Sequence, residues 1–212
     1  MKTKSNIIGY VGAFEMPEVV RGLNAFTLGV RSVNPKAVVK IKYTNTWYDP
    51  AKEKEAAKAL LDEGADVIAQ HQDTAGPQQA AEERGAFSIG YNTDMQNSAP
   101  NANMTSAVWN WGKFYVEQVK AIIDGTWKSG SYWDGMETGI VDLAPLTKNA
   151  PEGAEEKVKK AKEDIISGKN KIFVGPIKDN KGKERVAEGK VMTDEELLNF
   201  DWYVEGVRNG GK

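Results

Sequence analysis

The residues with the clearest chemical potential are aromatic and polar side chains that follow four short apolar runs. Phe14, Trp47, Asp73 and Asn92 each stand just after one such run and before a stretch with helical spacing. Rings that stack on a flat ligand, beside carboxylates and amides that bond to its edges, suit a neutral, polar small molecule. The pattern contains no paired nucleophile and base, so it favours binding over covalent chemistry.

Three further residues extend this group of candidate ligand-binding side chains. Tyr48 shares the loop of the second run, Asp94 closes the fourth loop, and Trp109 stands beside an amide and a second indole, Trp111. Each has a plainer interpretation. Aromatic residues can cover a helix N-terminus, aspartates such as Asp94 and Asp73 favour caps and turns, and both tryptophans could pack in an interdomain core.

Catalytic, metal and phosphate sites find little support in the sequence. His71 is the sole histidine and no cysteine is present, so we expect no metal and no cofactor. A general-base role for His71 beside Asp73 would fit a flavodoxin-like or sugar-phosphate enzyme, but no GxSxG elbow accompanies it. Gly9 and Gly12 do not form a GxGxxG fingerprint, and Glu15 would repel a phosphate. We therefore assign no catalytic residue.

The elements that must position these side chains alternate between strand and helix. Apolar runs predict strands at 7–12, 38–43, 65–69 and 86–90, and helical spacing follows at 17–30, 50–63 and 74–84. Strands that alternate with helices pair in parallel, so all four loops should emerge at the carboxyl edge of one sheet. The candidate residues should therefore surround one hollow on that rim.

The regular alternation of strand and helix ends after Asp94. We expect an apolar run at 105–109, a strand at 139–143, a hairpin that pairs 172–174 with 185–186, and a last helix capped by 193–196. Helices are expected at 112–124 and 154–167. These elements suggest a Rossmann-like ligand-binding lobe at 6–95, a hinge crossing with a remnant of another lobe at 96–138, and a return segment at 139–212.

Composition narrows the function classes. The 212 residues carry 28 basic and 30 acidic side chains, well mixed along the chain, for a formal net charge of −2. This balance provides no electrostatic footprint for nucleic acid or an anionic membrane. The absence of cysteine leaves the compartment open. The chain carries no signal peptide, and its abrupt start before a strand leads us to expect a fragment or a truncated gene product.

Four segments resemble the BMP (basic membrane protein) family of ABC-transporter substrate-binding proteins. They are residues 17–26 (PEVVRGLNAF), 64–68 (GADVI), 89–94 (IGYNTD) and 141–145 (VDLAP). The resemblance implies a type I periplasmic-binding-protein fold, with two Rossmann-like lobes and no enzymatic activity. It also implies a periplasmic or membrane-anchored location for the full-length form, an ABC permease as partner and a purine nucleoside as ligand.

Departures from the family pattern refine these expectations. In the family, an aromatic residue at the position of Trp47 stacks on the base. Asn92 stands where the family has an acidic residue, and Trp109 stands where nucleoside binders resemble Ser-Val-Val-Lys. Loss of an acid and a lysine weakens ribose recognition, so we expect a free nucleobase such as adenine, or another planar heterocycle. A cytoplasmic small-molecule-sensing regulatory domain of the same fold is the alternative.

Length is the largest departure, because family members carry a lobe of about a hundred residues before the segment matching 7–12. We therefore expect an α/β chain with one complete lobe and part of a second. The apolar face of the helix at 112–124, formed by Phe114, Val119, Ile122 and Ile123, should be partly exposed or repacked. Binding by this chain alone should be weak or absent, because clamshell proteins bury the ligand between two lobes.

Overall fold

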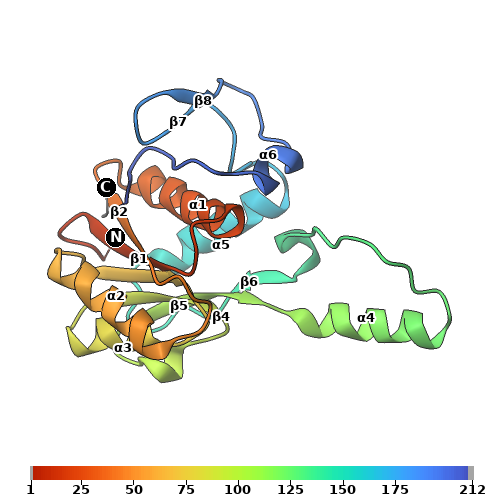
Figure 1. Ribbon diagram of the computed structural model, residues 1–212, viewed down its shortest axis with the longest axis horizontal. Coiled ribbons are helices and arrows are strands. Elements are labelled where there is room, and N and C mark those ends of the chain that lie inside the picture. Colours follow the sequence, from red (N-terminus) through yellow and green to blue (C-terminus); the bar gives the residue numbers. More distant parts are fainter. Residues whose placement is uncertain (1, 210–212) are drawn as a thin grey trace.

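The computed structural model describes residues 2–209, and a seven-stranded sheet forms its centre (Figure 1). The strand order is β6-β5-β4-β3-β1-β2-β9; every neighbouring pair is parallel except β5 and β6. The strands are β1 (Ile7–Gly12), β2 (Val38–Tyr43), β3 (Val67–His71), β4 (Phe87–Asn92), β5 (Asn103–Trp109), β6 (Val141–Leu143) and β9 (Val207–Asn209).

Helices cover both faces of the sheet. In Figure 1, α2 and α3 lie below it, and α1 and α5 lie above it together with α6 and the β7–β8 hairpin. The long helices are α1 (Pro17–Val33), α2 (Pro50–Asp62), α3 (Gly76–Glu83), α4 (Trp111–Ile123) and α5 (Ala154–Ile166). The smaller elements are η1 (Gln96–Ser98), η2 (Met136–Thr138), β7 (Ile177–Lys178), β8 (Glu184–Val186) and α6 (Asp194–Leu198).

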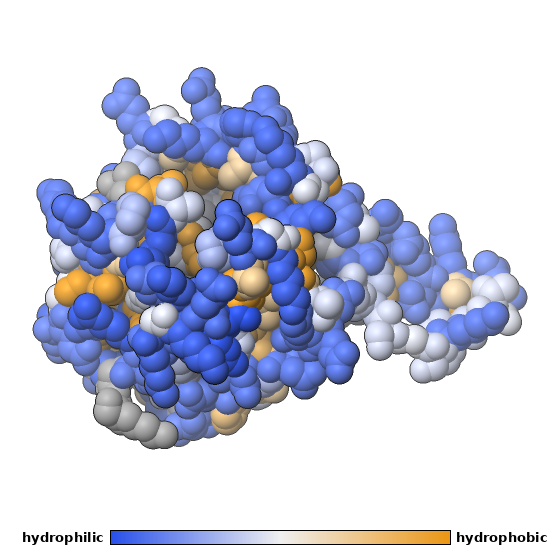
Figure 2. Space-filling model, turned by 90° about the horizontal axis from the view of Figure 1, so that it is seen from above, coloured by the Kyte–Doolittle hydropathy of each residue, from blue (hydrophilic) through white to orange (hydrophobic). Residues whose placement is uncertain are grey.

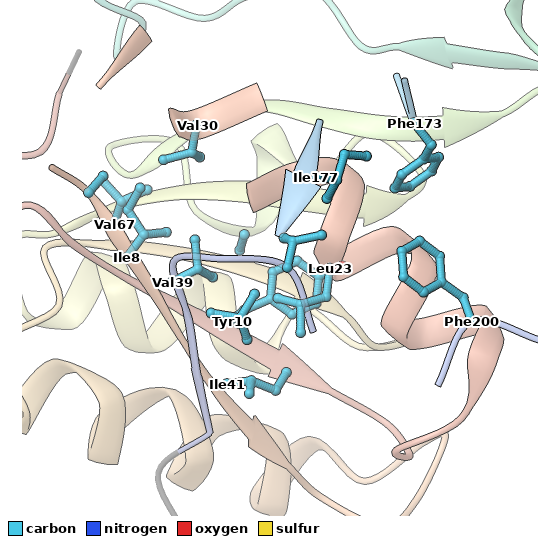
Figure 3. Close-up of a cluster of buried hydrophobic side chains, with 14 of the residues drawn as sticks. Ile8, Tyr10, Leu23, Val30, Val39, Ile41, Val67, Phe173, Ile177 and Phe200 are labelled. Carbon is cyan, nitrogen blue, oxygen red and sulfur yellow. The ribbon is translucent and has the colours of Figure 1, made fainter. Parts of the chain in front are cut away.

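The larger hydrophobic core lies between α1, the sheet and the C-terminal segments (Figure 3). Pro17 occupies the first turn of α1, where its missing N–H costs nothing, and Leu23 and Val30 face inward two turns apart. Phe173 and Phe200 come from the C-terminal part of the chain and meet edge to face at 5.2 Å between ring centroids. The C-terminal segments therefore complete the core of the N-terminal strands.

The second core lies between the sheet and helices α2 and α3, and most of its buried side chains are alanines. Ala57 of α2 and Ala80 of α3 are fully buried. Gly9 of β1 lets α2 approach the sheet, since a Cβ there would lie 2.7 Å from Ile68 Cδ1 and 2.9 Å from Leu60 Cβ. Close helix–sheet packing fixes where the loop before α2 begins, and that loop carries Trp47.

Helix α4 differs from the others because none of its residues is buried. Figures 1 and 2 both show it projecting from the body as an arm. Val119, Ile122 and Ile123 are 55%, 62% and 77% exposed, and Phe114 is half-buried. This confirms the expectation that the apolar face of the helix lacks a full cover.

Several sequence predictions need correction. Strand β3 covers Val67–His71, two residues beyond the predicted 65–69, because the strand continues through two polar residues that are buried. The predicted pairing of 172–174 with 185–186 is wrong: β7 at Ile177–Lys178 pairs with β8, while Val174 bridges Val191. Strand β9 was not expected to join the sheet. The division at 95 and 138 stays a prediction; the central sheet takes strands from all three ranges.

Candidate functional site

One ring stands at the carboxyl end of each of five neighbouring parallel strands, β1 to β5. Phe14 follows β1, Trp47 follows β2, His71 ends β3, Tyr91 lies near the end of β4 and Trp109 ends β5. Ring centroids lie 5.3 Å apart for Phe14 and Trp47, 6.3 Å for Trp47 and His71, 4.3 Å for His71 and Tyr91, and 4.7 Å for Tyr91 and Trp109. These contacts form a continuous row, which we call the aromatic row.

A hollow of about 360 Å³ opens beside the aromatic row. The structure thus brings together four of the predicted site residues, Trp47, Asp73, Asn92 and Trp109, as the parallel-sheet argument expected. Phe14 contacts the ring of Trp47 without lining the hollow itself. The full lining is Glu18, Trp47, His71, Asp73, Tyr91, Asn92, Trp109 and Trp111.

Two predicted residues lie outside this hollow. Tyr48 is 69% exposed and is not among the residues that line the hollow. Asp94 lines a neighbouring hollow that shares Asn92 and Trp109, and its Oδ1 accepts a hydrogen bond from the Gln96 N–H at 2.9 Å. Asp94 therefore acts at least as a turn former, as its plainer interpretation proposed.

Asp73 does not cap a helix. Helix α3 begins at Gly76 with Ala75 in the cap position, and the Asp73 carboxylate accepts no hydrogen bond within residues 2–209. Asp49 is the true cap: its Oδ1 accepts from the Lys52 N–H at 3.0 Å at the start of α2. Asp73 therefore stands exposed at the rim with its oxygens free for a ligand.

Short-range hydrogen bonds place the loop that carries Trp47. Thr44 N–H donates to Gly12 O at 3.0 Å, and Asn45 N–H donates to Ala13 O at 2.9 Å, which ties this loop to the end of β1. Asn45 has φ of 56°, in the left-handed region where asparagine is tolerated better than most residues. The chain thereby turns sharply after β2 and brings Trp47 over Phe14.

Glu53 joins two rim loops from below. This fully buried carboxylate on α2 accepts from Asp49 N–H at 3.1 Å through Oε1. Through Oε2 it accepts from Thr74 N–H at 3.2 Å and from the Thr74 hydroxyl at 2.6 Å. A buried carboxylate is stable only when such donors surround it. Glu53 thus holds the loop after β2 and the loop after β3 in a fixed relation.

A chain of buried amides lies under the loop after β3. Gln70 Nε2 donates to Thr74 O at 2.7 Å, Gln78 Nε2 donates to Gln70 Oε1 at 2.8 Å, and Asn103 Nδ2 donates to Gln78 Oε1 at 3.0 Å. Sequence reasoning missed this network and Glu53. The only available signal was polar residues, such as Gln70, inside an otherwise apolar strand pattern. These bonds link the loop after β3 to α3 and β5 through buried side chains.

His71 and Tyr91 form the centre of the aromatic row. The Tyr91 hydroxyl and His71 Nε2 lie 2.8 Å apart in a hydrogen bond. Burial, and then the charge of Arg21, lower the pKa of His71 to about 4, so the imidazole is neutral at neutral pH. Burial also raises the pKa of Tyr91. Neither group is an activated base or nucleophile, which agrees with a ligand-orienting role. Sequence reasoning did not single out Tyr91.

Neither a metal-binding group nor a membrane-spanning helix occurs among the described residues. Within residues 2–209, no group of three His, Asp or Glu side chains could hold a metal ion. The same residues contain no helix with the length and apolar character of a membrane span.

Comparison with known proteins shows the family of this chain. The Bmp family, described as PnrA-like ABC transporter substrate-binding proteins, matches residues 1–181. The chain belongs to this family. The resemblance to this family of transport binding proteins, expected from the sequence, is confirmed.

Individual Bmp relatives differ in the ligands for which they are named. The chain is 43% identical over 205 residues to a purine-binding protein of Brucella abortus, covering 97% of this chain and 58% of that protein. It is 40% identical over 175 residues to TsgA13 of Haloferax volcanii, whose name connects it with glucose binding, covering 82% of this chain and 45% of that protein. The chain thus spans about half the length of these relatives.

Solved structures confirm the predicted α/β solute-binding-protein fold. A solute-binding protein of an ABC transporter system from Conexibacter woesei matches with a TM-score of 0.60 and 27% identity, covering 79% of this chain and 57% of that chain. A transcriptional activator of the comK gene from Bacillus halodurans matches with a TM-score of 0.70 and 24% identity, covering 80% and 59%. The second likeness concerns the fold alone.

Proposed function

We propose that this chain is the ligand-binding part of an ABC importer's solute-binding component, and that it binds a purine nucleobase or nucleoside without converting it. The observation that carries the proposal is the aromatic row beside the hollow at the carboxyl edge of the sheet. The purine-binding relative from Brucella abortus supports the same ligand class.

Stacking is the interaction that this site can supply most strongly. Trp47, Trp109 and Trp111 line the hollow with extended π faces, and each base stacked on an aromatic side chain gains about 1–3 kcal/mol. No lysine or arginine lines the hollow, which disfavours phosphorylated ligands. The ligand class that fits is a flat, uncharged heterocycle. Phe14 supports the ring of Trp47 from behind.

The hollow is one wall of a binding cleft in this proposal. It opens to solvent beside Trp111, the first residue of the projecting helix α4. In this proposal, a second lobe covers the exposed apolar residues of α4, including Ile122 and Ile123. The two Bmp relatives named above are about twice as long as this chain, which leaves enough residues for such a lobe. The complete protein would present its closed cleft to an ABC permease, from the periplasm or from a membrane anchor.

Binding to this chain alone should be weak, because one wall supplies about half of the contacts. The test is titration of the 212-residue chain with adenine, adenosine or glucose at millimolar concentration, followed by ligand-observed NMR and tryptophan fluorescence. We expect the purines to bind with millimolar affinity. Trp47→Ala should weaken binding about tenfold, as removal of one stacked ring predicts.

Trp127→Ala is the matched control. Trp127 is half exposed, bonds to Gln118 on α4 and does not line the hollow, so its removal should leave purine affinity unchanged. Binding of glucose without purine binding would overturn the ligand class in favour of a sugar. Submicromolar affinity for this chain alone would contradict the half-cleft interpretation.

A further inference from the structure

The charged side chains that line the hollow are acidic. Two carboxylates, Glu18 and Asp73, line it, together with one amide, that of Asn92. Within residues 2–209, neither carboxylate accepts a hydrogen bond; the nearest cationic-type nitrogen recorded for Glu18 is His71 Nε2, 3.9 Å from its Oε1. Both carboxylates are therefore available as acceptors beside the aromatic row.

Within residues 2–209, no lysine or arginine forms an ion pair with either carboxylate, although Arg21 lies one turn from Glu18 on α1. His71 is uncharged at neutral pH because burial lowers its pKa to about 4. Arg21 is already engaged: its guanidinium donates to Leu197 O at 2.9 Å and lies 5.0 Å from the centroid of the Trp133 ring. A ligand in the hollow thus meets two carboxylates that lack a protein counter-ion at hydrogen-bond distance.

Both carboxylates lie close to the middle of the aromatic row. Glu18, Asp73 and Tyr91 line the same hollow, and after burial the charges of Glu18 and Asp73 act to raise the pKa of Tyr91. Glu18 comes from the first turn of α1 and Asp73 from the loop after β3. Two separate elements therefore contribute carboxylate acceptors to one hollow.

We propose that Glu18 and Asp73 are specificity-determining residues that select amino-substituted bases, whose N–H groups face them, over bases with a carbonyl at that edge. This inference rests on the proposed purine site. An ionised carboxylate only accepts hydrogen bonds, so it pairs with an exocyclic amine but repels the lone pairs of a carbonyl oxygen. A carboxylate that a bound ligand covers without donating to it loses its hydrogen bonds to water, and this disfavours the wrong ligand.

The test compares adenine with hypoxanthine, which differ in carrying an amino group or a carbonyl oxygen at the same ring position. NMR titration of the 212-residue chain should show adenine binding at least about tenfold more tightly. Glu18→Gln and Asp73→Asn should each reduce this ratio several-fold, because an amide can also donate to the carbonyl of hypoxanthine. Both side chains are largely exposed, so both variants should keep the far-UV circular dichroism of the parent.

Glu156→Gln is the matched control, since Glu156 is an exposed carboxylate in the first turn of α5, outside the lining. It should leave the ratio unchanged. Equal affinity for the two bases, with Trp47→Ala still weakening both, would overturn this inference and leave the purine site standing. Failure of both bases to bind at millimolar concentration would overturn the proposed function itself.

Discussion

Replacement of Glu53 by glutamine should destabilise the protein although it changes only one atom of the side chain. Glu53 is fully buried, and its two oxygens accept from three donors, at 3.1 Å from Asp49 N–H, 3.2 Å from Thr74 N–H and 2.6 Å from the Thr74 hydroxyl. A glutamine has one acceptor oxygen, so its NH₂ group must face either Asp49 N–H or the Thr74 donors.

The better orientation keeps the oxygen toward Thr74, which preserves two of the three bonds. The Thr74 hydroxyl also accepts from Gly76 N–H at 3.1 Å, so this orientation maintains the whole chain of bonds into α3. The lost bond to Asp49 N–H is charge-assisted and leaves a donor against a donor. We therefore expect a cost of about 2 kcal/mol for Glu53→Gln and about 4 kcal/mol for Glu53→Ala, which abandons all three donors.

Urea and thermal unfolding, followed by circular dichroism, would measure these changes in the free energy of unfolding. For a chain of this size, about 2 kcal/mol lowers Tm by about 4–8 °C. Glu55→Gln is the control on the same helix, because Glu55 is exposed and pairs only with Lys58; it should change stability by less than about 0.5 kcal/mol. If Glu53→Gln is as mild as Glu55→Gln, the buried carboxylate does not hold the rim loops together.

Three further predictions follow from burial and exposure. His71 has a pKa of about 4 when folded against 6.5 for the free group, so protonation favours the unfolded chain. Between pH 7 and pH 4, the free energy of unfolding measured by urea titration should fall by about 3 kcal/mol more for the parent than for His71→Gln. Equal losses in the two proteins would contradict the burial of a neutral His71. Gly90→Ala would push a Cβ onto Ser106 Oγ, so unfolding assays should show a loss of about 1–3 kcal/mol, and an unchanged midpoint would refute the close packing. The double variant Ile122→Lys, Ile123→Lys should change stability by less than about 0.5 kcal/mol while reducing concentration-dependent self-association in sedimentation velocity, because both residues are more than 60% exposed; a large loss of stability would show that α4 packs on the body.

The position of most site residues at the rim could be predicted from the order of strands and helices in the sequence. Trp47, Asp73, Asn92 and Trp109 meet because each ends or follows a strand, and these parallel strands all end at one edge. The fold class needed only the alternation of apolar runs with helical spacing. Tyr48 is exposed outside the hollow although its neighbour Trp47 lines it, because residue spacing in an irregular loop does not predict where each side chain lies.

The elements after residue 95 were harder to place. The hairpin partner of β8 is β7 rather than 172–174, and β9 joins the sheet beside β2 from the far end of the chain. Short strands carry few residues of alternating pattern, so their partners are set by contacts with the core around Phe173 and Phe200. Such contacts link residues more than a hundred positions apart and leave no local signal.

By itself, the sequence determined a parallel α/β sheet with aromatic and polar residues at its carboxyl edge, since chain direction and strand ends are local properties. Tertiary structure alone decided that His71 is buried and neutral against Tyr91, and that Glu53 is enclosed while Glu18 and Asp73 stay free. The reason is that desolvation and hydrogen-bond partners depend on which distant groups surround a side chain. A carboxylate in the sequence becomes a structural tie or a ligand contact only when the packed chain supplies or withholds its donors.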